Sequence, residues 1–244
     1  MSEQKAVDTG TQNFRSPLVD MYAALTEKYN EGRDGIHVSD FLCPRQSYFK
    51  KEMPRPITNL DLGFFLLGRS MHDGAQLLCK RNPDYVIESF EVFDGVEAHI
   101  DLYRKSDNLP IEMKTARIPN LDQPKPHYLQ QLHSYMAMKN AERGCIIVFL
   151  VTHYMNKINK DTPLKQWTIS LTPEQLLEKK IWLMREGHTM KEARRTKDPS
   201  KLRFVMYDGD DWNFPCNNCK WLQECQDLNK KLGLVKPPEM NKKK

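Results

Sequence analysis

The sequence lacks an apolar segment long enough to cross a membrane, and it lacks an apolar leader at its N-terminus. Its longest apolar run covers residues 145–151, whereas a membrane-spanning helix needs about 20 predominantly apolar residues. The first residues are polar and do not resemble a secretory signal. We therefore expect a cytoplasmic protein that has no membrane as a partner.

The sequence also lacks an internal repeat and a strong charge of either sign. The 244 residues carry a net charge of +5, and 28% of them are charged. A chain of this length forms one large domain, or one domain with an appendage, and can bury a proper core. The mildly basic charge is compatible with nucleic acid as a partner but does not require it.

Six cysteines without a secretory signal argue against a disulfide framework and for thiols or metal ligands. Three of them lie within ten residues: Cys216, Cys219 and Cys225. Cys43 is the best candidate for a fourth ligand, because it lies near an expected helix start, where a thiolate is favoured. A pattern of one cysteine plus three distant ones favours an iron–sulfur cluster. Zinc is the second alternative, although zinc sites usually take their ligands from two local pairs, and free thiols are the third. Cys79 and Cys145 are expected to be small buried hydrophobes.

Hydrophobic spacing predicts an α/β chain with a mixed sheet flanked by helices. Apolar runs predict strands at residues 85–93, 96–103, 109–115, 145–154 and 165–171. Helical spacing predicts helices at residues 17–29, from Ser39 through Cys43 and Pro44, and at 60–80, 127–139 and 173–196.

These elements divide the chain into five segments. They are a disordered arm at 1–16, a helical segment with the first cluster cysteine at 17–57, a core at 58–205, a cysteine-bearing segment at 206–232 and a disordered Lys-rich tail at 233–244.

Two strands in the middle of the chain carry the polar pattern with the most chemical content. Asp101 lies in the first strand, and Glu112 and Lys114 lie two residues apart in the second. Residues i and i+2 of a strand point to the same face, and a hairpin would bring Asp101 close to Glu112. Two carboxylates beside an ammonium suit a hard divalent cation. The alternative is an exposed strand face with a surface Glu–Lys pair.

Further motifs appear in order around these residues: Gly68 with His72 four residues on, Ala98 with Asp101, Glu112-Met-Lys114, and Gln131 with Tyr135 four residues on. With the split cysteine set, they resemble the GxxxH, aspartate, ExK and QxxxY motifs of RecB-type nucleases of the PD-(D/E)xK superfamily. The chain is most similar to the branch with a four-cysteine 4Fe-4S cluster, the CRISPR-associated exonucleases of spacer acquisition. The resemblance covers about residues 38–225 and departs mildly at Ala98, where the family commonly has glycine.

The resemblance implies a restriction-endonuclease-like core and a subdomain in which the cluster joins the N- and C-terminal segments. It implies that Mg²⁺ or Mn²⁺ is bound by His72, Asp101, Glu112 and the main-chain carbonyl of Met113. Lys114 would orient the attacking water or stabilise the transition state. Gln131 and Tyr135, on one helical face, would hold Lys114 or the DNA backbone. The implied cluster ligands are Cys43, Cys216, Cys219 and Cys225.

A basic run at the end of the helix predicted at 173–196 is the best candidate for phosphate contacts. It includes Arg194, Arg195 and Lys197. Such contacts produce sequence-independent DNA binding that weakens with salt. Tyr128 is a further candidate for contact with the nucleic acid. The alternative for the basic run is an ordinary solvated face.

These residues predict a metal-dependent DNA nuclease, an exonuclease that acts on single strands or duplex ends. The resemblance further implies processing of DNA fragments for CRISPR spacer acquisition beside an integrase complex, and it leaves a homo-oligomer open. The alternatives are a recombination or repair nuclease of a virus or mobile element, a catalytically silent DNA-binding subunit, and a zinc-stabilised binding module.

Overall fold

The computed structural model describes residues 35–56, 58–116, 121–151, 164–205, 216 and 219–234. The arm expected at 1–16 and the helix expected at 17–29 lie outside these residues, as does nearly all of the tail expected at 233–244. Within these ranges, no helix combines the length and the apolar character that crossing a membrane requires.

The described residues contain one mixed sheet of six strands. The strands are β1 (Ile36–His37), β2 (Tyr85–Phe93), β3 (Val96–Arg104), β4 (Leu109–Ala116), β5 (Arg143–Leu150) and β6 (Leu164–Ser170). β3 pairs in parallel with β1 and antiparallel with β2 and β4. β5 pairs in parallel with β4 and antiparallel with β6. The predicted mixed sheet is therefore confirmed.

A two-residue turn connects β2 to β3. Asp94 and Gly95 have φ values of 50° and 71°, the left-handed conformations that a tight hairpin needs and that an Asp-Gly pair supplies. A side chain at Gly95 would also lie 2.6 Å from the Lys191 Nζ. The left-handed backbone conformation therefore favours glycine here, whereas the Lys191 side chain could move aside for a larger residue.

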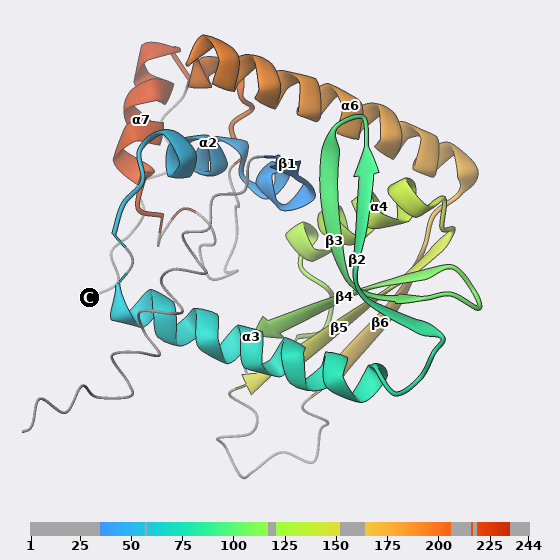
Figure 1. The fold of residues 1–244 in the computed structure, drawn as a ribbon. Helices are drawn as coiled ribbons and strands as arrows, with labels where there is room; N and C mark the ends of the chain where they lie inside the picture. The colour runs from blue at the N-terminus through green and yellow to red at the C-terminus, as the bar shows by residue number, and fades with distance from the viewer. Residues whose placement is uncertain are drawn as a thin grey trace, which may run out of the picture.

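Helices cover both faces of the sheet (Figure 1). α3 (Asn59–Cys79) lies on one side, and α4 (Pro126–Lys139) and α6 (Pro173–Thr196) lie on the other. The larger apolar core includes buried side chains of β5, α4 and α6, among them Ile146, Leu132 and Leu183. A smaller cluster around Ile111 and Met113 packs against α3. The sheet is thus an inner layer, and its two faces present different residues of β4.

Capping groups define where the long helices begin. The hydroxyl of Thr172 accepts a hydrogen bond from the Gln175 backbone N–H, and the Gln175 side chain accepts one from the Thr172 N–H. Pro173 occupies the first turn, where its missing N–H costs nothing. The helix predicted at 173–196 is confirmed at both ends, and those predicted at 60–80 and 127–139 are confirmed within one residue.

The helix predicted to start at Ser39 is divided in two. A 3-10 helix, η1 (Val38–Leu42), precedes α2 (Pro44–Glu52), and Cys43 caps α2 with φ −143° and ψ 89°. A proline disfavours helical geometry in the residue before it, so Pro44 starts a new helix instead of continuing the old one. The expectation that Cys43 lies near a helix start is confirmed.

The remaining strands agree with prediction except at one end. β2 has the predicted bounds, β3 and β4 are each one residue longer at their C-terminal end, and β6 begins and ends one residue earlier than predicted. β5 begins at Arg143 and ends at Leu150, whereas a strand was predicted at 145–154, of which residues 152–154 lie outside the described residues.

The segments on either side of the core meet through α2 and α7 (Leu222–Lys231), which lie side by side in Figure 1. The Trp221 Nε1 donates to the Met53 carbonyl at 3.0 Å. The Lys220 Nζ donates to the Pro56 carbonyl at 2.8 Å. We call this region the α2–α7 junction. It joins residues more than 160 positions apart, as the split cysteine pattern requires.

Candidate active site

The predicted carboxylates lie where two neighbouring strands separate. β3 and β4 pair through Leu102 and Ile111, and Asp101 and Glu112 are the next residues beyond that pair. The Asp101 Oδ2 accepts a hydrogen bond from the Met113 backbone N–H at 2.7 Å. The aspartate side chain therefore satisfies a strand amide that the ladder has left unpaired.

Glu112 is fully buried, at 0% exposure. Burial raises the pKa of Glu112 to about 8, the Lys114 ammonium opposes this rise, and the Asp101 carboxylate adds to it. Among the described residues, neither Glu112 oxygen has a hydrogen bond of ordinary geometry, although the Lys114 Nζ lies against Oε1. A buried carboxylate without a full set of donors favours a cation beside it.

Lys114 is held from the other side by α4. Its Nζ donates to the Gln131 Oε1 at 3.0 Å, and the Gln131 Nε2 donates to the Tyr135 hydroxyl at 2.6 Å. Burial lowers the pKa of Lys114, but the Glu112 and Asp101 carboxylates outweigh burial and the net shift is upward. The structure thus connects the predicted Lys114, Gln131 and Tyr135 in one chain of hydrogen bonds.

His72 reaches the site from α3, on the opposite side of the sheet. Its Nδ1 lies 3.6 Å from the Asp101 Oδ1. In the part of the chain that the structure describes, however, no three His, Cys, Asp or Glu side chains are close enough together to hold a metal ion. Of the predicted ligands, His72 lies beside Asp101, whereas Glu112 lies against Lys114, which is not a predicted ligand.

The donor set nevertheless fits a hard divalent cation. Carboxylate oxygens with one imidazole nitrogen suit Mg²⁺ or Mn²⁺. Within the described residues the buried Glu112 oxygens make no hydrogen bond of ordinary geometry, although Lys114 and Tyr135 lie close enough to lower the pKa of Glu112, and Asp101 raises it. Lys114 compensates one of the two carboxylates, and a cation between Asp101 and Glu112 would compensate the second.

Sequence reasoning missed two residues that support Asp101. The Gln76 Nε2 donates to the Asp101 carbonyl at 3.0 Å and to the Glu88 Oε1 at 2.9 Å. Glu88 has φ 50°, a left-handed conformation that is strained for a residue with a side chain. Gln76 lies four residues after His72 and hence on the same helical face, a signal that the sequence contains. Nothing in the sequence signals the conformation of Glu88.

The four predicted cluster cysteines gather at the α2–α7 junction. Burial raises the pKa of Cys43 to about 12, and the charges of Cys216, Cys219 and Cys225 contribute to the rise. None of the four forms a disulfide within the described residues. They are not close enough to count as a formed metal site within the described residues, so cluster binding would have to draw the four sulfurs together.

The other two cysteines lie at the opposite side of the core. Cys145, on β5, is 3% exposed and belongs to the smaller apolar cluster. Cys79, at the end of α3, is partly buried against the same cluster. Burial raises the pKa of both thiols. The prediction that they act as small apolar side chains agrees with these positions.

The residues predicted to contact DNA have partners within the chain. The Arg194 Nη2 lies 3.4 Å from the Asp40 Oδ2, and Arg195 donates two hydrogen bonds to Glu192, at 2.8 and 2.7 Å. Lys197 is the exposed left-handed cap of α6. Tyr128 is only 6% exposed. Their DNA contacts stay a prediction.

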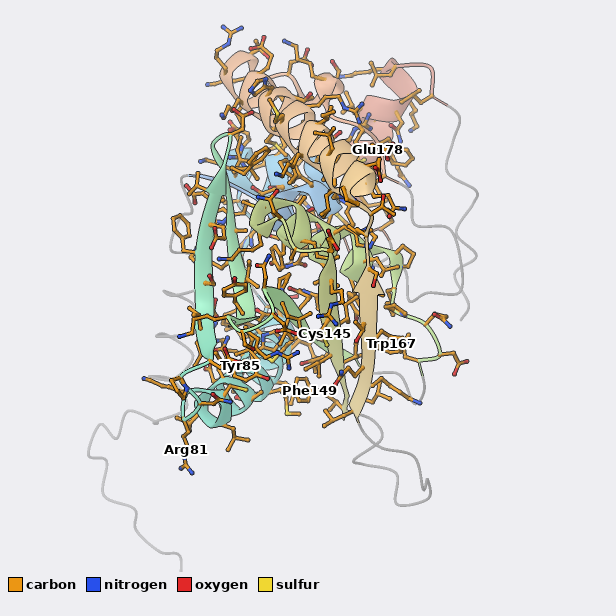
Figure 2. The ribbon with its side chains drawn as sticks, turned by 90° about the vertical axis from the view of Figure 1, so that its right-hand side faces the viewer. Arg81, Tyr85, Cys145, Phe149, Trp167 and Glu178 are labelled. Atoms are coloured by element: carbon orange, nitrogen blue, oxygen red, sulfur yellow. The ribbon has the colours of Figure 1, made fainter. Side chains whose placement is uncertain are left out.

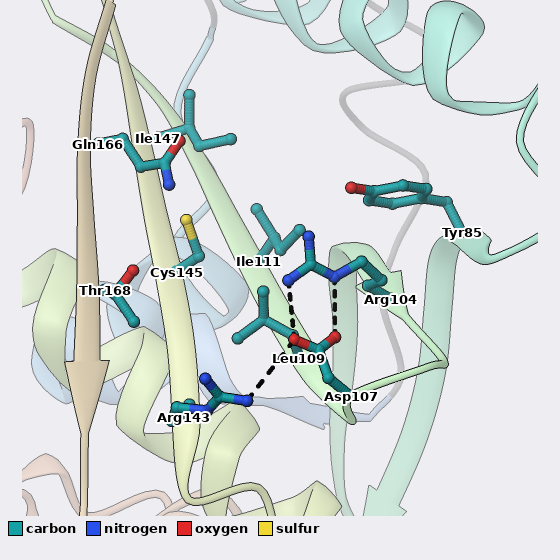
Figure 3. A pocket seen from close by; sticks show the side chains of 10 residues that line it. All are labelled: Tyr85, Arg104, Asp107, Leu109, Ile111, Arg143, Cys145, Ile147, Gln166 and Thr168. Carbon is teal, nitrogen blue, oxygen red and sulfur yellow. Dashed lines mark hydrogen bonds and ion pairs between the residues drawn. The ribbon is translucent and has the colours of Figure 1, made fainter.

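A pocket of about 180 Å³ opens elsewhere on the sheet (Figure 3). Arg104 donates to both oxygens of Asp107, at 2.8 and 2.7 Å, and Arg143 lies 3.8 Å from the same carboxylate. The pocket also contains Tyr85 and Cys145, which point into the molecule in Figure 2, whereas Arg81 points away from it. None of the predicted catalytic or cluster residues lines this pocket.

Comparison with known proteins supports the fold and leaves the family open. No protein-family model matches the chain, and no curated protein matches it. The crystal structure of SSO0001 matches with a TM-score of 0.54 and 18% identity, covering 85% of this chain and 96% of that one. At this identity the likeness shows the fold alone. It agrees with an α/β mixed sheet flanked by helices.

Two exonuclease structures are also similar. LHK-Exo in complex with dAMP matches with a TM-score of 0.46 and 14% identity, covering 76% of this chain and 100% of that one. A phage-related exonuclease from Haemophilus somnus 129PT matches with a TM-score of 0.48 and 12% identity, covering 70% of this chain and 99% of that one.

Proposed function

We propose that the chain is a divalent-metal-dependent DNA nuclease, an exonuclease that acts on single strands or DNA ends. The observation that carries the proposal is the arrangement at the separation of β3 and β4. There, the buried Glu112 carboxylate lies against the Lys114 ammonium and within the electrostatic reach of Asp101. An exposed surface Glu–Lys pair, the alternative reading of these residues, does not describe a carboxylate that is 0% exposed.

His72, Asp101, Glu112 and the main-chain carbonyl of Met113 are the proposed ligands of Mg²⁺ or Mn²⁺. A bound divalent cation polarises a scissile phosphate and lowers the pKa of a bound water. The chain's own part is to hold these donors in place. The Met113 N–H and Gln76 fix Asp101, and strand pairing fixes the backbone on either side of it.

Lys114 supplies a positive charge whose position the chain controls. Gln131 accepts from its ammonium, and the Tyr135 hydroxyl accepts from the Gln131 amide and so orients it. An ammonium held in this way orients a water by hydrogen bonding and stabilises negative charge that develops on the phosphate. Because the side chains are already positioned, little reorganisation is needed during the reaction.

We further propose that Cys43, Cys216, Cys219 and Cys225 hold a 4Fe-4S cluster that joins the two segments of the α2–α7 junction. Their gathering from opposite ends of the chain supports this, and we propose a structural role because the cluster would link those two segments. Zinc is the competing occupant. Iron, sulfide and zinc analysis of the anaerobically purified protein separates the two.

The motif resemblance supports a finer proposal, the trimming of DNA fragments before their insertion into a CRISPR array. A recombination or repair nuclease is the alternative. The discriminating assay adds the chain to a CRISPR integrase and DNA with long single-stranded ends. Trimming to one defined length, followed by insertion, supports the CRISPR role, whereas unrestricted digestion favours the alternative.

The experiment that tests nuclease activity is degradation of end-labelled single- and double-stranded DNA with Mn²⁺, Mg²⁺ or EDTA. The wild type is compared with Lys114→Ala and with Lys105→Ala, an exposed lysine between β3 and β4, as a surface control. Loss of one well-placed charge stabiliser costs about 100- to 1,000-fold in rate, and we expect such a loss in Lys114→Ala alone. Wild-type protein that binds DNA but does not cut it would indicate a silent binding subunit.

A further inference from the structure

Arg45 is a buried arginine whose partners are unlike those of the arginines around it. It is 3% exposed, and its Nε donates to the Leu202 carbonyl at 3.1 Å. Its Nη1 donates to the Asn229 Oδ1 at 2.5 Å and lies 3.9 Å from the Cys225 Sγ. The guanidinium also lies over the Phe204 ring, 5.3 Å from its centre.

Other arginines in this part of the molecule each have a carboxylate partner: Arg55 with Glu224, Arg194 with Asp40 and Arg203 with Glu186. Across the ranges that the structure describes, Arg45 makes no ion pair with a carboxylate, and the only ionisable group that its guanidinium contacts is the Cys225 thiol. Guanidinium groups stay charged at all ordinary pH values, and burial of an uncompensated charge is costly. A negative charge on the Cys225 sulfur would therefore compensate the buried charge of Arg45.

Asn229 provides a second and independent indication. It is 2% exposed, and its Oδ1 is taken by Arg45. Its Nδ2 is a buried donor that has no acceptor among the described residues. Buried amide donors are normally satisfied. Asn229 lies one helical turn after Cys225 on α7, so its side chain belongs to the same face of the helix as that sulfur.

We propose that Arg45 and Asn229 are positioning residues for the cysteine cluster, and we call them the donor pair. They donate hydrogen bonds to the cluster's sulfurs, above all to that of Cys225, and compensate part of its negative charge. This inference rests on the proposed 4Fe-4S cluster. Four thiolates carry more negative charge than the iron and sulfide of the cluster neutralise, and hydrogen bonds to the sulfurs raise the reduction potential and slow ligand loss. Arg45 contributes the charge, and Asn229 orients Arg45 through its Oδ1.

The first test uses the anaerobically purified full-length chain and the variants Arg45→Gln and Arg45→Lys. Loss of an outer-shell partner typically weakens metal binding about 10- to 100-fold. We expect Arg45→Gln to lose iron to a chelator at least about 10-fold faster and to show a more negative reduction potential. Arg45→Lys should lie between it and the wild type, because it keeps the charge without the planar fork.

Arg203→Gln is the matched control. Arg203 also joins distant segments, through the Phe41 carbonyl and Glu186, and no contact between it and a cysteine is found among the described residues. Its loss should lower the unfolding temperature and leave the reduction potential unchanged. Equal potentials in Arg45→Gln, Arg203→Gln and the wild type would overturn the proposal.

Asn229→Asp separates a role toward sulfur from a purely structural one. The new carboxylate would pair with Arg45 and withdraw its charge from the sulfurs. The metal-free protein should therefore unfold at a higher temperature, while the iron-loaded protein loses iron faster. A structural role moves both quantities in the same direction, and that result would count against the proposal.

A wild-type protein that contains zinc or no metal overturns both the cluster and the donor pair. The DNA degradation assay then still decides whether the chain is a nuclease, because it depends on Lys114 and not on Arg45. Iron in the wild type with unchanged Arg45 and Asn229 variants overturns the donor pair alone.

Discussion

The separation of β3 and β4 and the α2–α7 junction show two ways in which one chain assembles a polar site. At the first, the partners are near in sequence: Asp101 accepts from Met113, and Lys114 donates to Gln131. At the second, Arg45 bonds Leu202 and Asn229, which are 157 and 184 positions away. Strand pairing positions the residues of the first site. The residues of the second site come together only when the segments around α2 and α7 pack against each other.

The two sites also differ in how their charges are compensated. Glu112 has an ammonium against it, whereas Arg45 has no carboxylate among the described residues. A site whose charges are paired internally can form before it binds anything. A site with an unpaired buried charge depends on its ligand for stability.

The largest effect is expected from Cys216→Ala. Loss of one of four proposed cluster ligands should remove nearly all iron and lower the unfolding temperature, because ligand binding stabilises the native state. The protein that remains folded should still cut DNA, since the carboxylate site is built from other elements. Iron per chain, thermal unfolding and DNA degradation are measured together. Cys79→Ala is the control, and iron that survives in Cys216→Ala would refute the ligand assignment.

Gln131→Leu should damage only the carboxylate site. Without the Gln131 acceptor, Lys114 keeps its charge and loses its position, and misplacement of a catalytic group by about 1 Å can cost about 100-fold in rate. We expect a fall of this size in the rate of DNA degradation, with the visible spectrum of the cluster unchanged. Gln130→Leu, one position away on α4, is the control because Gln130 bonds the Phe41 carbonyl instead.

Substitutions of Glu88 allow the backbone strain at the carboxylate site to be measured. Glu88→Gly and Glu88→Ala both remove the contact with Gln76, but only glycine accepts φ 50° without cost. The glycine variant should be more stable than the alanine variant by about 1 kcal/mol. Chemical denaturation of both variants gives this difference directly. Equal stability would show that the backbone at residue 88 is not strained in solution.

The smallest effect is expected on α6, remote from both sites. Burial lowers the pKa of Lys179 to about 7, with a further contribution from the neighbouring Arg203 charge. The unfolded chain therefore binds more protons at this position than the folded protein does, and stability should rise as the pH increases from about 7 toward 10. Lys179→Met should remove this dependence and stabilise the protein at pH 7 by about 1 kcal/mol. Denaturation at several pH values checks both statements.

Much of the fold was predictable because interactions between residues close in sequence determine it. The capped start at Thr172 and Pro173, the Asp-Gly turn at residues 94 and 95, and the alternation along β3 are determined by neighbouring residues. The one divided helix is also explained locally, by the effect of Pro44 on Cys43. Sequence reasoning missed it because helical spacing continues across the proline.

For the candidate site, the sequence predicted which residues share a face, and their roles as ligands and catalytic groups stay a prediction. The ExK spacing and the QxxxY spacing place residues on common faces, and the structure brings Lys114, Gln131 and Tyr135 together. The burial of Glu112 and the left-handed backbone of Glu88 were not predictable, because both depend on which elements cover the sheet.

The sequence by itself determined most of the secondary structure and the separation of the four proposed cluster cysteines into one early residue and three late ones. Only the tertiary structure decided that Arg45 lies against Cys225 and has no carboxylate partner in the part of the chain that is described, while Arg203 and Arg194 have one. Local spacing sets which residues share a face of one helix or strand. The charges that compensate each other across the junction depend on contacts between residues far apart in the chain, and no spacing in the sequence encodes those.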